Sequence, residues 1–155
     1  MKMTITALLG RVLMSLGVVI AGCVPLQVDL SSTHVFNPAW PAHARLHEVW
    51  LLSTGGLLAL VALYFIWFYR MRPRFGITLG AVLGSVLLGG FFIAASTASL
   101  YGGILVDPLT APMMPNQDLL MGLPANAVVF GVAWLLLLIG RFTATTSSGT
   151  DPTGR

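Results

Sequence analysis

Residues 49–101 read VWLLSTGGLLALVALYFIWFYRMRPRFGITLGAVLGSVLLGGFFIAASTASLY, which is two apolar segments on either side of a short turn rich in arginine. The first segment covers residues 49–69 and the second covers 75–101. A helix needs about 20 apolar residues to cross the hydrocarbon layer of a membrane. Both segments reach that length, so we expect a hairpin of two transmembrane helices joined by the turn at 70–74.

The composition of the whole chain agrees with a location in lipid. The 155 residues are 56% hydrophobic and 8% charged, with a mean hydropathy of +0.87. A soluble domain carries about 25% charged residues, and a chain this short leaves much of its surface in contact with water. These values exclude a soluble globular domain, a disordered chain and a coiled coil. The single cysteine also excludes an intramolecular disulfide.

Two further segments have the same apolar character, over residues 5–28 and 125–140. Arg11 is the one charged residue in the first of them, and we expect its guanidinium to extend to the nearer membrane face. The sequence therefore predicts an all-α polytopic membrane protein, a single four-helix transmembrane domain over 1–142. Residues 143–155 are rich in Thr, Ser and Gly and are predicted to form a disordered tail.

The positions of the charges predict the orientation. With four spans, all but one of the eight Lys and Arg residues fall on one side of the membrane, and the other side holds Arg45 and four of the five acids. Because Lys and Arg are enriched in cytoplasmic loops, we expect both termini in the cytoplasm. The expected location is the cell membrane, and specifically a bacterial inner membrane. The net charge of +3 is then a topology signal, and nucleic acid is excluded as a partner because no basic cluster is interleaved with aromatic residues.

The segment 75–101 repeats a small residue every four positions, at Gly76, Gly80 and Gly84. Small residues at this spacing let helix backbones approach closely in lipid. Two interpretations follow. The first is packing inside the bundle, which we favour, and the second is a homo-oligomer formed through this face.

The sequence Ile20-Ala21-Gly22-Cys23 resembles a bacterial lipoprotein processing site. Cleavage there would remove the first span and leave Cys23 lipidated, with the orientation of the remaining spans unchanged. The apolar segment continues to Val28, however, and three more spans follow it. We therefore favour an unprocessed chain in which Cys23 is a small buried hydrophobe.

Polar chemistry is concentrated in the loop that precedes the second span. Residues 33–48 read THVFNPAWPAHARLHE and contain all three histidines of the chain. The two prolines break regular structure, and from about Ala42 the chain can continue as a helix. His43 and His47 then share one helix face, and Glu48 lies toward a neighbouring face. Ionisable residues that cluster at a membrane are costly to bury and often mark function.

Three interpretations of this loop remain open. In the first, His43, His47 and Glu48 are catalytic, and they exchange protons with a hydrophobic substrate stacked on a tryptophan. In the second, His43 and His47 bind a transition metal, with His34 or Glu48 completing the set of ligands. In the third, which we favour, the cluster holds the loop together. No residue is assigned to a metal, and no cofactor is assigned.

A second outward loop, 102–124, faces the same side of the membrane. Together the two loops predict an outward-facing pocket for a lipid-like or small hydrophobic ligand, while the molecular function and any enzymatic activity stay open. The candidate ligand-binding residues are His34, Asn37, Trp40, Arg45, Trp50, Asp107, Asn116 and Asp118.

The run T-H-x-F-N-P-x-W-P-x-H-A-R-x-H over residues 33–47 resembles the signature of a family of small, uncharacterised four-helix membrane proteins. The resemblance implies four membrane spans and a functionally important loop at residues 33–47, and it implies no particular activity. In architecture alone, the chain is also similar to small membrane sterol isomerases, which are bundles with acidic residues and Trp around a lipid-accessible pocket. The alternative of isomerase-like His/Glu chemistry follows from that analogy.

Overall fold

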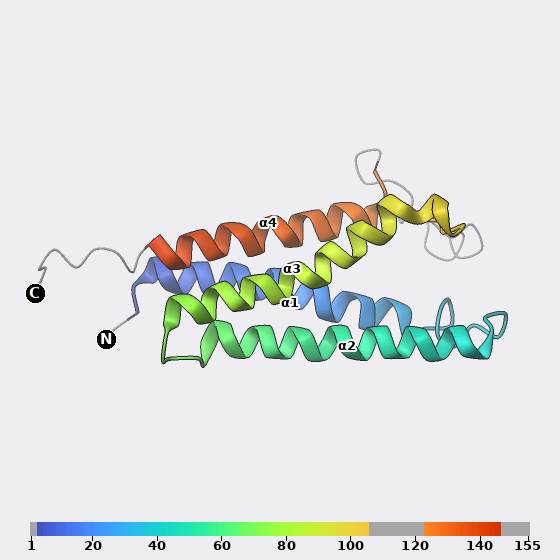
Figure 1. Ribbon diagram of the computed structural model, residues 1–155, viewed down its shortest axis with the longest axis horizontal. Helices are drawn as coiled ribbons and strands as arrows, with labels where there is room; N and C mark the ends of the chain where they lie inside the picture. The colour runs from blue at the N-terminus through green and yellow to red at the C-terminus, as the bar shows by residue number, and fades with distance from the viewer. Residues whose placement is uncertain (1–2, 106–122, 147–155) are drawn as a thin grey trace, which may run out of the picture.

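The computed structural model describes residues 3–105 and 123–146, and these form an all-helical bundle. Its elements are α1 (Ile5–Asp29), α2 (Ala42–Trp67), α3 (Pro73–Thr97), the short 3-10 helix η1 (Ala98–Leu100) and α4 (Ala125–Thr146). The four α-helices lie side by side in an elongated bundle (Figure 1). All four are long and apolar enough to cross a membrane, which confirms the all-α class and the number of candidate spans.

Two ends of the bundle differ in chemistry. One end carries the start of α1, the turn 68–72 between α2 and α3, and the last turn of α4 (Figure 1). We call it the arginine end. The opposite end carries the loop 30–41 and the end of α3, and we call it the histidine end.

Local sequence explains where the helices begin. Thr4 caps α1, because its hydroxyl accepts a hydrogen bond from the backbone N–H of Ala7 at 3.1 Å. Pro73 opens α3, where its fixed backbone angle suits the first helical turn and its missing N–H is not needed. α2 starts at Ala42, directly after Pro41.

α4 continues beyond the predicted span, which ended at residue 140. Residues 143–146, predicted as part of a disordered tail, are helical. Their hydroxyls are satisfied within the helix: Thr143 donates to the carbonyl of Ile139 at 2.8 Å, and Thr145 donates to that of Arg141 at 2.9 Å. Ala144 is buried, which gives this last turn a packing role. The rest of the predicted tail, 147–155, lies outside the described residues.

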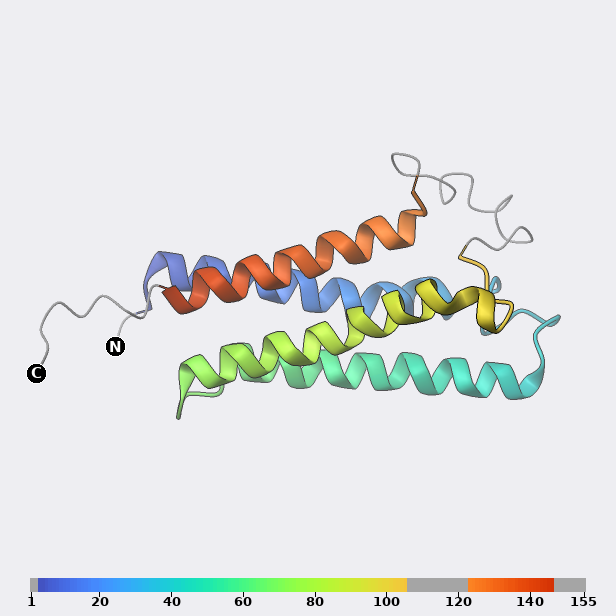
Figure 2. The ribbon, with the colours of Figure 1, turned by 45° about the horizontal axis from the view of Figure 1, so that its top comes forward.

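α1 packs on α4 with the two backbones almost touching (Figure 2). A Cβ atom built on Gly10 would lie 2.4 Å from the backbone nitrogen of Ala144, and one built on Gly140 would lie 2.5 Å from the carbonyl oxygen of Gly10. A Cβ on Gly17 would likewise lie 2.5 Å from the carbonyl oxygen of Ala133. Glycine is required at these positions because any side chain would push the helices apart.

α3 packs on α2 through the predicted small residues. A Cβ on Gly76 would meet the carbonyl oxygen of Phe65 at 2.8 Å, and one on Gly80 would meet the side chain of Ile66 at 2.6 Å. Gly84 faces Leu137 of α4. The glycine face is therefore occupied inside the bundle, as the favoured packing interpretation expects.

Cys23 differs from its expected environment. α1 passes through it without a break, but the side chain is exposed on the helix surface. The neighbouring Gly22 takes the buried position, since a Cβ there would meet the Cβ of Ala59 at 2.5 Å. The expectation of a buried cysteine is therefore wrong, because the contact with α2 needs a glycine one residue earlier.

Polar side chains join α1 to the end of α2. Arg11 donates from a terminal guanidinium nitrogen to the carbonyl of Ile66 at 2.5 Å. The indole N–H of Trp67 donates to the hydroxyl of Ser15 at 2.8 Å, and that hydroxyl donates to the carbonyl of Arg11 at 2.9 Å. Carbonyl groups in the last turn of a helix lack partners within the helix. Arg11 supplies a partner to one of them, so it ties two helices together and does not simply extend to the membrane face.

Candidate functional site

The loop 30–41 is folded back on the end of α1 by backbone hydrogen bonds. The N–H of Val35 donates to the carbonyl of Asp29 at 3.0 Å, and the N–H of Phe36 donates to that of Ser31 at 2.9 Å. Val35 is buried, while Phe36 points outward with 65% of its surface exposed. The loop is thus a compact cap over the histidine end.

Asn37 holds the proline-containing part of this cap. Its side-chain carbonyl accepts from the N–H of Ala39 at 3.0 Å, and its amide donates to the carbonyl of Thr33 at 3.3 Å. An asparagine that bonds the backbone two residues ahead forms an Asx turn, which places Pro38 at the bend. Asn37, a predicted ligand-binding residue, therefore has a structural role here.

His34 is the best-connected side chain of the loop. One ring nitrogen, Nε2, lies 3.6 Å from a carboxylate oxygen of Asp29, and the other, Nδ1, lies 2.9 Å from the hydroxyl of Thr33. Trp40 meets the ring edge to face, with centroids 5.5 Å apart. Sequence reasoning named His34 and Trp40 but missed Asp29, which ends α1 only five positions before the histidine.

Glu48 lies at the same end of the bundle as His34. It is partly buried in the second turn of α2, while Asp29 ends α1 and His34 lies in the loop between the two helices. Two carboxyl groups and one imidazole therefore lie in the region where α1 ends and α2 begins.

The other two histidines form a separate group on the exposed face of α2. The Nε2 atoms of His43 and His47 lie 3.0 Å apart, so one ring donates to the other. The ring of His47 also stacks on that of Trp50, with centroids 5.9 Å apart. The three residues proposed as catalytic are thus not all in one group: the two exposed histidines pair with each other, while Glu48 is partly buried.

Arg45 lies in the first turn of α2 and is partly buried. Its Nε atom has no hydrogen-bond partner in the described part of the chain. Asp107, Asn116 and Asp118, the other predicted ligand-binding residues, lie in 106–122, outside the described residues.

The two exposed histidines supply two nitrogens for a metal ion. Within residues 3–105 and 123–146, however, no three His, Cys, Asp or Glu side chains are grouped to hold one. A stable protein site for zinc takes at least three protein ligands. The described residues therefore support hydrogen bonding and stacking at this face more directly than metal binding.

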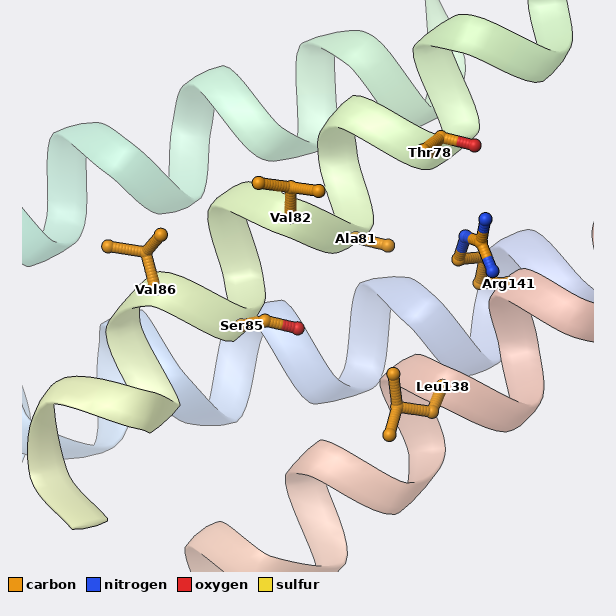
Figure 3. Close-up of a pocket in the computed structure, with 7 residues that line it drawn as sticks. All are labelled: Thr78, Ala81, Val82, Ser85, Val86, Leu138 and Arg141. Atoms are coloured by element: carbon orange, nitrogen blue, oxygen red, sulfur yellow. The ribbon is translucent and has the colours of Figure 1, made fainter. Parts of the chain in front are cut away.

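Two cavities lie away from the loop. One, of about 360 Å³, is at the arginine end and is lined by Tyr69, Met71, Arg72 and Phe75. The other, of about 370 Å³, lies between α3 and α4 (Figure 3). Its lining side chains are Thr78, Ala81, Val82, Ser85, Val86, Leu138 and Arg141. Sequence reasoning assigned none of these to a site.

One sequence family matches most of the chain. The sequence model of a family of unknown function (DUF6640) matches residues 13–138. No curated protein matches the chain, and no solved structure does. The match covers α2, α3, the loop at the histidine end and most of α1 and α4.

Proposed function

The chain belongs to DUF6640, a family of unknown function, and we propose its role from its own residues. It is a multi-pass protein of the cell membrane with both termini in the cytoplasm. At the histidine end it binds a lipid-like or small hydrophobic ligand on the face formed by His43, His47 and Trp50.

The separation of charge supports this orientation. Arg70, Arg72, Arg74 and Arg141 gather at the arginine end, while the acids of the described residues, Asp29 and Glu48, lie at the histidine end. Lys and Arg mark the cytoplasmic side of a membrane protein. The arginine end therefore faces the cytoplasm, together with the start of α1 and the end of α4.

The stacked side chains on α2 carry the ligand proposal. Trp50 is 66% exposed and lies just inside the predicted span, and Leu46 beside it is 64% exposed. Tryptophan is enriched at the boundary between headgroups and hydrocarbon. A ligand with a polar group and an apolar body fits this boundary: His43 and His47 offer hydrogen bonds, and Trp50 offers an aromatic surface for stacking.

A second candidate function is acid–base catalysis on a hydrophobic substrate. The observation that favours it is the 3.6 Å contact of His34 with Asp29, with the partly buried carboxyl group of Glu48 at the same end of the bundle. The proton-exchanging pair is then His34 and Glu48, with Trp40 beside them, in place of the two exposed histidines. Substitutions His34→Gln and Glu48→Gln would each abolish turnover under this proposal, while His43→Ala would leave it intact.

Orientation is tested by cysteine labelling in a Cys23→Ala background. Ser32→Cys places a thiol in the exposed loop of the histidine end, and Met71→Cys places one in the turn of the arginine end, where Met71 is 87% exposed. A membrane-impermeant maleimide should label the first thiol in intact cells and the second only after permeabilisation. The reverse pattern would refute the orientation.

Ligand binding is tested with a photoreactive fatty acid in liposomes that contain the protein. We expect adducts on the peptide around Trp50, and a lower yield in Trp50→Ala and in His43→Ala. Tyr64→Ala is the matched control, because Tyr64 is an exposed aromatic residue on the same helix near the arginine end. An equal loss in all three variants, or no loss in any, would rule out a site at the histidine end.

A further inference from the structure

The groove between α3 and α4 has apolar walls with polar groups at defined places. Val82, Val86 and Leu138 line it and are about half exposed, at 51%, 59% and 48% of their surfaces. Behind it runs α1 (Figure 3). The groove thus has apolar walls and is open to the side of the bundle. Its volume of about 370 Å³ is large enough to accept part of a molecule from the surrounding lipid.

One polar contact bridges the two helices within this groove. The indole N–H of Trp134 on α4 donates to the hydroxyl of Ser85 on α3 at 3.1 Å. This bond fixes the spacing of α3 and α4 along the groove. The hydroxyl of Ser85 therefore already has a hydrogen-bond partner within the protein. An apolar chain can cover the groove around it and the hydroxyl keeps that partner.

The other end of the groove is positively charged. Arg141 lies one turn before α4 ends at Thr146, and Thr78 lies across from it on α3, at the same end of the groove (Figure 3). The acids within the described residues, Asp29 and Glu48, are both at the opposite end of the bundle. No acid in the described part of the chain is placed to neutralise Arg141, so the groove offers its charge to an external anion.

We propose that this groove binds an acidic phospholipid of the cytoplasmic leaflet. The phosphate contacts the guanidinium of Arg141, with the hydroxyl of Thr78 as a second donor, and one acyl chain lies along Val82 and Val86. Arginine presents a planar fork of N–H donors that fits a phosphate, and basic pockets between helices on the cytoplasmic side are sites of this type. The inference requires the proposed membrane location and orientation but not the ligand site at the histidine end.

The test is retention of lipid by the purified full chain. Protein reconstituted in equimolar phosphatidylcholine and phosphatidylglycerol is released from the bilayer in the mass spectrometer, and the bound lipid is identified. We expect the wild-type chain to retain phosphatidylglycerol in preference to phosphatidylcholine. Arg141→Gln should weaken this retention about tenfold or more, because a charge-assisted hydrogen bond is lost.

Two further variants separate a built site from general charge attraction. Arg70→Gln removes the same charge at the same end, and Arg70 does not line the groove, so it should retain the lipid. Val82→Trp fills the groove and leaves every charge in place, so it should lose the lipid. Three results would each overturn the proposal. The first is an equal loss of phosphatidylglycerol in the two arginine variants, and the second is full retention of that lipid in Arg141→Gln or in Val82→Trp. The third is equal retention of phosphatidylglycerol and phosphatidylcholine by the wild-type chain. If instead the chain did not enter the liposomes at all, the proposed membrane location would be wrong.

Discussion

Replacing Gly10 by alanine tests the close backbone contact between α1 and α4. The new Cβ would lie 2.4 Å from the nitrogen of Ala144, 2.8 Å from its Cα and 2.7 Å from the carbonyl oxygen of Gly140. All three are backbone atoms, which cannot rotate away as a flexible side chain can. α1 and α4 must therefore separate locally, and contacts along their whole shared face are loosened.

The expected magnitude follows from two opposing effects. Overpacking of this kind costs about 1–3 kcal/mol, and replacing a helical glycine by alanine returns about 0.5–1 kcal/mol. Gly90→Ala is the matched control, because the Cβ that it would add to α3 has no atom within 4 Å apart from its chain neighbours and the nearby backbone of the same helix. The control should be stabilised by the second effect alone, so the difference between the two variants is the overpacking cost itself.

The assay is reversible unfolding in mixed micelles, with sodium dodecyl sulfate as the denaturant and helix content as the signal. Gly10→Ala should unfold at a lower detergent fraction than the wild type, and Gly90→Ala at an equal or higher one. If the two variants unfolded at the same point, α1 and α4 would not be in backbone contact, and the described packing would be wrong.

Three smaller effects are expected from single contacts. Ser15→Ala and Trp67→Phe each remove the same hydrogen bond, so in a double-mutant cycle they should show a coupling of about 0.5–1.5 kcal/mol; additive losses would contradict the contact. Asn37→Ala removes two loop hydrogen bonds and should speed hydrogen exchange of the loop amides with little change in the helices, and unchanged exchange would show that the turn forms without it. Asp29→Asn should destabilise the loop by less than about 1 kcal/mol, because the 3.6 Å contact with His34 is partly exposed; a loss of several kcal/mol would mean that this pair is more deeply buried than described.

The site was only partly predictable from the loop sequence. The pairing of His43 with His47 follows from their spacing on a helix, and the structure has it. The contact of His34 with Asp29 does not follow, because it depends on how the loop 30–41 folds back on the end of α1. The fold of this loop depends on hydrogen bonds made by several different residues, and the spacing of those residues in the sequence does not predict them.

The groove was not predicted for a related reason. Thr78, Ser85 and Arg141 are unremarkable in sequence, two hydroxyls in one apolar segment and an arginine after another. They line one groove only because α4 lies against α1 and leaves the groove between α4 and α3.

The sequence by itself determines the four long helices of the described residues and where they begin and end, to within a few residues except at the end of α4. It also determines that arginines gather at one end of the bundle and histidines at the other. Hydropathy and charge are properties of each residue, so they can be read without knowing its neighbours. Tertiary structure alone decides that α1 pairs most extensively with α4, whereas the hairpin of α2 and α3 follows from the short turn between them. Lipid is as apolar as leucine, so hydrophobicity does not distinguish one face of such a helix from another. The faces are distinguished by how closely two helix backbones can approach, as at Gly10 and Gly140. That closeness is a property of a pair of packed helices and not of either sequence segment alone.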